Sequence, residues 1–291
     1  MTRATPDSSG TRELVVGIGV LAVVLVVVYV TWVSTAWGHT LDNDAYFGAG
    51  ESARGVVVAD RDFLNDVTRL SLGVGLIVLL VVSLVRRILS VGLIAVAGVI
   101  VAVAGAEVLK RTLSWSELVP SDASLGAGLR AETYPSGHAT IGTSVALAVV
   151  MLVPVGWRVW AGLGAGLLSA TFATAVVIAG WHRPSDALGG VCWAGLVMAI
   201  AALIAVRFRQ EQESTSIPAN RRTSLLRSNA IAAVIFYGAL LMLASGSSFE
   251  YPDADPAFLV TMAPIVIAAF SVTAWFADSL RGAVWRERAL A

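Results

Sequence analysis

Lysine and cysteine are almost missing from this 291-residue chain, and charge of either sign is scarce. The one cysteine, Cys192, excludes an internal disulfide. Charged residues make up 14% of the chain, whereas about a quarter is usual in soluble domains. The formal net charge is zero, so the composition gives no sign of a nucleic-acid partner. With 57% hydrophobic residues, the chain is predicted to be an all-α integral membrane protein.

Long apolar runs divide the chain into candidate membrane spans, since a span needs about 20 mostly apolar residues. We expect about eight transmembrane helices, of which the second is the shortest and weakest candidate. The predicted spans are 14–33, 70–85, 88–109, 139–156, 159–180, 187–206, 229–246 and 257–277.

Polar segments between these spans suggest four parts. We expect a cytoplasmic tail over 1–13, a six-span catalytic core over 14–206, a cytoplasmic linker over 207–228 and a two-span extension with a cytoplasmic tail over 229–291. An acidic outer segment, 38–69, has partly helical spacing and is expected to lie along the membrane or cap the outer face. A solvated loop is favoured over metal binding by its carboxylates. His39 within it is interpreted as an ordinary surface residue.

The distribution of basic residues predicts the orientation. With a cytoplasmic N-terminus, 13 basic residues fall inside and seven outside, in the direction of the positive-inside rule. The chain is therefore expected to be a multi-pass protein of the cell (plasma) membrane, with the polar clusters described next facing outside the cytoplasm.

The first cluster is Pro-Ser-Gly-His at 135–138, immediately before an apolar run. This placement predicts that Ser136, Gly137 and His138 stand at a helix N-terminus, where unpaired N–H groups and the helix dipole attract anions. A plain N-cap by Ser136 is the structural alternative.

The second cluster contains His182 and Asp186, four residues apart at the start of the sixth span. Pro184 suits the first turn of a helix, and this spacing brings the two side chains together. A carboxylate that fixes one imidazole nitrogen leaves the other free to attack. The alternative is that Asp186 only complements the helix dipole.

Lys110 ends the third span and is the one lysine beside 19 arginines. It could be an interfacial anchor or a partner of Glu107 one turn earlier. Lys110 precedes both outward-facing clusters, and a single lysine at such a place suggests a catalytic residue.

Lysine, Pro-Ser-Gly-His and His-x-x-x-Asp, in this order, resemble the motifs of the type-2 phosphatidic acid phosphatase superfamily, over about 14–206. That superfamily includes membrane lipid phosphatases and is related to vanadium haloperoxidases. The resemblance implies that His182 is a nucleophile forming a phosphohistidine, that Asp186 orients it and that His138 protonates the leaving group. It also implies that Lys110, Ser136 and Gly137 hold the phosphate, and that neither metal nor cofactor is needed.

Two positions depart from the family pattern. Glu117 and Leu118 stand where the family has Arg-Pro after the lysine, and Ala175-Val176 stand where it has Ser-Arg. Both phosphate-clamping arginines are therefore absent from their usual places. Candidate substitutes are Arg111, Arg130 and Arg183, and Arg130 is the preferred one.

The resemblance implies a membrane lipid phosphatase that hydrolyses a phosphate or pyrophosphate monoester, with a polyprenyl pyrophosphate or a related carrier lipid of the bacterial envelope favoured. A phosphotransferase with a sugar or lipid acceptor would use the same residues. A non-catalytic lipid-phosphate-binding protein is the third hypothesis. The expected partners are the lipid phosphate substrate and membrane lipids, and the sequence leaves the oligomeric state open.

Overall fold

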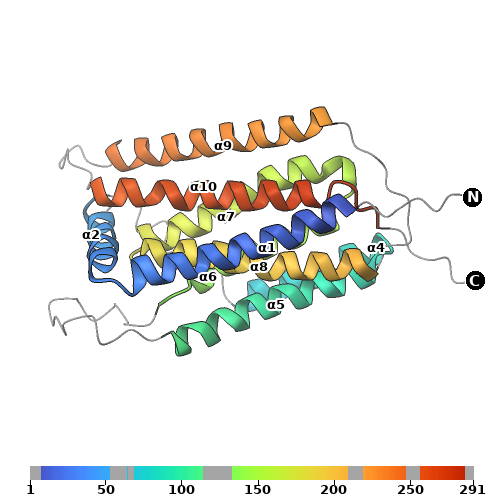
Figure 1. Ribbon diagram of the computed structural model, residues 1–291, viewed down its shortest axis with the longest axis horizontal. Coiled ribbons are helices and arrows are strands. Elements are labelled where there is room, and N and C mark those ends of the chain that lie inside the picture. Colours follow the sequence, from blue (N-terminus) through green and yellow to red (C-terminus); the bar gives the residue numbers. More distant parts are fainter. Residues whose placement is uncertain are drawn as a thin grey trace, which may run out of the picture.

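A computed structural model describes residues 8–52, 64, 69–113, 133–208, 219–246 and 256–285, and these form helices without strands. The prediction of an all-α membrane protein is thereby confirmed. The long helices run side by side, and the start of α1 and the end of α10 lie at the same end of the bundle (Figure 1). The helices, in order, are α1 (Ser8–Val28) with a π-helical continuation (Tyr29–Val33), α2 (Ala36–Ser52), α4 (Arg69–Val85), α5 (Leu89–Thr112), α6 (Gly137–Leu152), α7 (Arg158–Ile178), α8 (Pro184–Phe208), α9 (Ala219–Gly246) and α10 (Pro256–Ser279).

Eight of these helices occupy the places of the predicted spans. Within the described residues, five helices are long and apolar enough to cross a membrane, and three shorter apolar stretches lie in α4, α6 and α9. The apolar part of α4, Leu72–Val85, is short, as the sequence predicted for the second span. Helix α1 begins at Ser8, within the segment expected to be the cytoplasmic tail.

Helices α7 and α8 form the centre of the bundle. In the most apolar stretches of α7 and α8, 67% of the residues are buried, against 17% in the stretch that contains α1. Helix α10 packs against both α7 and α8, and α9 lies on the outside of α10 (Figure 1). The loop that begins α8 is therefore held from several sides.

Small residues allow these helices to approach one another closely, as is common in membranes. A Cβ added to Gly142 of α6 would lie 2.4 Å from Cγ of Phe172 in α7. One added to Gly166 of α7 would lie 2.5 Å from Phe270 in α10. These glycines thus set the spacing of α6, α7 and α10.

A buried arginine, Arg158, connects the start of α7 to the end of α10. Arg158, at the start of α7, donates from Nη1 to the carbonyl of Leu280 just beyond α10. Its guanidinium also stacks on the ring of Trp285, whose Nε1 donates to the carbonyl of Met151 at 2.7 Å. The basic residue therefore satisfies a carbonyl at a helix C-terminus.

Helix α2 differs from the prediction in the burial of its side chains. As its partly helical spacing suggested, the first part of the acidic segment is a helix, and it lies across the end of the bundle opposite the start of α1 (Figure 1). His39, expected on the surface, is 6% exposed, and Asp42, expected among solvated carboxylates, is 2% exposed. These two expectations were wrong, because the face of α2 that carries the two residues packs onto the bundle.

The spacing argument predicts that Gly142→Ala lowers the thermal unfolding midpoint in detergent. Overpacking a tight core site costs about 1–3 kcal/mol, and Phe172 meets the new methyl with its ring base rather than with a flexible end. Gly164→Ala is the matched control, because no atom lies within 4 Å of its added Cβ. Equal midpoints for the two variants would contradict the role of Gly142.

Candidate active site

The first half of the site is the start of α6. This helix begins at Gly137 with Ser136 as its N-cap, as the sequence predicted, and the Ser136 side chain accepts from the N–H of Ala139 at 3.4 Å. The hydroxyl of Thr140 donates to the carbonyl of Ser136 at 2.8 Å. In the described part of the chain the N–H groups of Gly137 and His138 have no acceptor. This end of α6 can therefore receive an anion.

The second half is the loop that begins α8. Val176 accepts the N–H groups of Trp181 and His182, at 3.0 and 3.1 Å. The backbone angle φ of Gly180 is 68°, a left-handed conformation that glycine adopts without strain. The chain thus reverses between α7 and α8 and presents His182 at the helix start.

His182 and Asp186 are brought together as predicted. Nδ1 of His182 lies 3.4 Å from Oδ2 of Asp186, which also accepts the N–H of Arg183 at 3.0 Å. Asp186 is 1% exposed and His182 8%. Because Nδ1 faces the carboxylate, Nε2 is the nitrogen left for chemistry.

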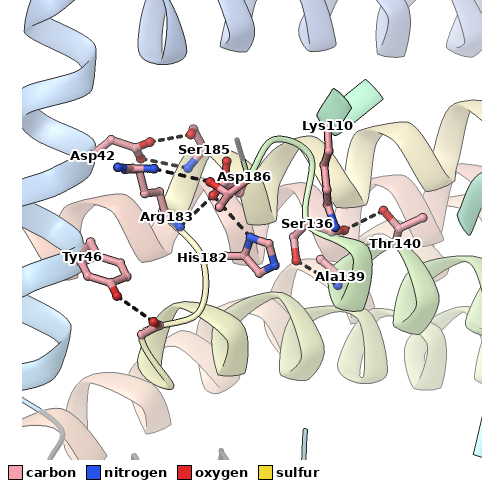
Figure 2. A network of polar contacts seen from close by, with 12 residues as sticks. Asp42, Tyr46, Lys110, Ser136, Ala139, Thr140, His182, Arg183, Ser185 and Asp186 are labelled. Carbon is pink, nitrogen blue, oxygen red and sulfur yellow. Dashed lines mark hydrogen bonds and ion pairs between the residues drawn. The ribbon is translucent and has the colours of Figure 1, made fainter. Parts of the chain in front are cut away.

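The two halves meet directly. The N–H of Ser136 donates to the carbonyl of Asp186 at 2.8 Å, and His182 lies between Asp186 and Ser136 (Figure 2). The His138 ring packs against Trp181, with ring centroids 5.2 Å apart, and His138 interacts electrostatically with His182 and Lys110. One site therefore contains both imidazoles.

Lys110 reaches the same place from the end of α5. Its Nζ bonds Oε1 of Glu107 at 2.7 Å, so the predicted pairing with that glutamate exists. The same Nζ would lie only 3.2 Å from a Cβ on Gly137. The ammonium thus stands beside the N-terminus of α6, and a larger residue than glycine would crowd it.

Helix α2 supplies groups that sequence reasoning missed. Asp42 accepts from the N–H and the hydroxyl of Ser185, at 2.9 and 2.5 Å. Asn43 accepts from Nε of Arg183 at 2.8 Å, and the hydroxyl of Tyr46 donates to the carbonyl of Gly180 at 2.7 Å. Their helical spacing was the only available signal, and it identified no partner.

Burial shifts the ionisation of this helix. Desolvation and the nearby Asp186 carboxylate raise the pKa of Asp42 to about 7, against the hydrogen bonds from Ser185. Desolvation, followed by the positive charge of Arg183, lowers the pKa of His39 to about 4. Near neutral pH His39 is therefore uncharged, and Asp42 is close to its titration midpoint.

The three candidate substitute arginines differ in their surroundings. Arg111 is exposed at the end of α5, and Arg130 lies outside the described residues. Arg183 is 2% exposed and donates to Asn43 and to the hydroxyl of Thr133, the latter at 3.4 Å. Ala175 and Val176, where the family has Ser-Arg, are buried in α7.

No cluster of three or more His, Cys, Asp or Glu side chains that could hold a metal ion occurs in the described ranges. The groups gathered here suit another chemistry. They are a carboxylate-oriented imidazole, a second imidazole, an ammonium and free helix N–H groups, which together fit nucleophilic attack on a bound phosphoryl group.

Comparison with known proteins agrees with this geometry. The family model of the PAP2 superfamily matches residues 91–211, which include Lys110, both site histidines and Asp186. The resemblance to the type-2 phosphatidic acid phosphatase superfamily is confirmed over this segment. At the level of the superfamily, the match supports a phosphatase-type membrane lipid enzyme. No curated protein and no solved structure matches the chain.

The contact between the two helix starts predicts that Gly190→Ala lowers phosphatase activity. Its new Cβ would lie 2.7 Å from the carbonyl oxygen of Ser136 and 2.9 Å from Cβ of Ala139, so the start of α6 must move. A shift of about 1 Å can cost about 10²-fold in rate. Gly75→Ala, with open space around its Cβ, is the control, and equal rates of phosphate release would contradict the prediction.

Proposed function

We propose that the protein hydrolyses a phosphate or pyrophosphate monoester of a membrane lipid through a phosphohistidine on His182. The observation that carries this proposal is the placement of the His182–Asp186 pair against the N-terminus of α6, with the Ser136 N–H bonded to the Asp186 carbonyl at 2.8 Å. An oriented imidazole, an anion-binding helix end and a second imidazole are then within one site.

In the first step the lone pair on Nε2 of His182 forms a bond to phosphorus while the bond from phosphorus to the leaving oxygen breaks. Asp186 accepts the Nδ1 proton in a hydrogen bond and stabilises the imidazolium that forms. His138, protonated, transfers its proton to the leaving alkoxide or phosphate.

In the second step water attacks the phosphohistidine. His138, now neutral, accepts a proton from the water as the new P–O bond forms and the P–N bond breaks. Inorganic phosphate leaves, and His182 and His138 return to their initial states. The same two residues therefore serve both half-reactions.

Binding of the phosphoryl group is assigned to Lys110, Ser136 and Gly137. The free N–H groups of Gly137 and His138 and the Lys110 ammonium approach from one side of His182. Interactions that strengthen as charge develops on the phosphoryl oxygens accelerate the reaction, and one such donor is worth about 10²–10³ in rate. Because Glu107 holds Lys110 in place, the ammonium is already oriented.

The position of the site supports a lipid substrate. The site lies at the ends of apolar helices, opposite the start of α1 (Figure 1), so a substrate tail can remain in the membrane while its phosphate reaches His182. The distribution of basic residues favours an orientation with this end outside the cytoplasm. We favour a polyprenyl pyrophosphate or a related carrier lipid of the plasma membrane.

Detergent-purified protein is expected to release inorganic phosphate from at least one lipid among polyprenyl pyrophosphate, polyprenyl monophosphate, phosphatidylglycerol phosphate and phosphatidic acid, without added metal. His182→Ala abolishes the release, because no nucleophile remains. With ³²P-labelled substrate, acid quenching traps an acid-labile phosphoprotein in the parent and none in His182→Ala. Phosphate release that survives in His182→Ala would disprove the phosphohistidine mechanism.

Arg130 is expected to supply the positive charge that the two missing family arginines would provide. Arg111 is exposed, Arg183 is engaged by Asn43 and Thr133, and Arg130 precedes Thr133 by a short stretch of chain. Arg130→Ala therefore lowers kcat/KM by about 10²-fold or more, the scale of one transition-state donor. Arg12→Ala, exposed near the start of α1, is the charge-matched control, and full activity and substrate affinity in Arg130→Ala would refute the assignment.

A further inference from the structure

Three side chains of α2 contact three residues of the segment that carries His182. Tyr46 bonds the carbonyl of Gly180, Asn43 accepts from Arg183, and Asp42 accepts twice from Ser185. Figure 2 shows the contacts of Asp42 and Tyr46 on the side of His182 away from Lys110. The partners are 134 to 143 residues apart in the chain. The segment 180–186 is therefore held by α2 as well as by α7 and α8, the two helices that flank it in sequence.

These contacts bracket the nucleophile. Ser185 and Arg183 stand between His182 and Asp186, and the Arg183 N–H bonds the same Asp186 oxygen that faces His182. A displacement of either residue therefore changes the distance between imidazole and carboxylate. Asp42, Arg183 and Ser185 are each at most 2% exposed, and buried polar groups of this kind are costly to leave without partners.

Charge links α2 to the catalytic pair as well. The Arg183 guanidinium interacts electrostatically with both Asp42 and Asp186. Thr133, which accepts from Arg183, also hydrogen-bonds Asp186. Asn43 thus keeps a positive charge beside the carboxylate that orients His182.

We propose that α2 is a positioning element for the reaction, in which Asp42 fixes Ser185 and Asn43 fixes Arg183 so that Asp186 holds His182 in its attacking geometry. The proposal rests on the proposed function in taking His182 as the nucleophile. Asp42, Asn43 and Tyr46 touch no substrate in this scheme. They act through the segment 180–186.

The first test is Asp42→Asn against Asp44→Asn. Both remove one carboxylate from α2, but Asp44 is exposed and Asp42 is bonded to Ser185. We expect Asp42→Asn to lower kcat by about 10²-fold, the cost of a displacement of about 1 Å, with KM unchanged because the phosphate-binding groups stay in place. Parent-like kcat in Asp42→Asn would overturn the proposal.

A double-mutant cycle separates positioning from general loss of stability. Asp42→Asn and Ser185→Ala both change the contact between the Asp42 carboxylate and the Ser185 hydroxyl, so the double variant should be little slower than the slower single variant. Independent, multiplying losses would show that Asp42 does not act through Ser185. If Asp42→Asn fails to fold, Tyr46→Phe removes the hydroxyl that bonds the carbonyl of Gly180 and should lower kcat in the same way.

A readout without turnover distinguishes failure of this proposal from failure of the proposed function. The chain has three histidines, so ¹⁵N-imidazole labelling gives three ring systems, assigned with His39→Gln and His138→Gln. Asp42→Asn and Asn43→Ala should shift the His182 signals, and Asp44→Asn should leave them in place. Unmoved His182 signals would contradict the positioning role even in an active enzyme. Shifted signals in a protein that releases no phosphate would contradict the proposed function alone.

Discussion

One backbone hydrogen bond joins the two halves of the site, and the rest of the site depends on it. The Ser136 N–H and the Asp186 carbonyl belong to the starts of α6 and α8, which are far apart in sequence. Near the end of a membrane bundle an unpaired backbone group is costly, so this bond fixes the two helix ends at one separation. Gly190 has no side chain to keep them apart, and the anion-binding turn of α6 therefore faces His182.

Local patterns were enough to predict the apolar spans, the N-cap of α6 and the contact between His182 and Asp186. Apolar runs gave the spans, Ser136 before Gly137 gave the cap, and the spacing of His182 and Asp186 gave their contact. Each of these signals lies within a few residues along the chain. Their roles in the reaction are proposals that the spacing suggests and that the geometry supports.

The contribution of α2 could not be predicted in this way. Asp42 looked like one of several solvated carboxylates, and its partner Ser185 lies 143 residues later. His39 looked exposed because its neighbours are polar, but the bundle end buries it. Hydropathy describes only the segment over which it is calculated. Asp42 and His39 are buried by other helices of the bundle, which lie outside that segment. Only the packing of α2 across the bundle shows which of its polar side chains point inward.

The charges of the site also support the proposal that a further arginine takes part. Lys110 is paired with Glu107, and Arg183 faces both Asp42 and Asp186. Below a pH of about 7, where Asp42 is protonated, Arg183 balances Asp186. Above it, Arg183 faces two carboxylates. In neither state does Arg183 offer surplus positive charge to a phosphate, so in the proposed reaction a cation from elsewhere supplements the Lys110 ammonium and the helix N–H groups. Because the segment 114–132 connects α5 to Thr133 and contains Arg130, that cation is available one short stretch of chain from the site.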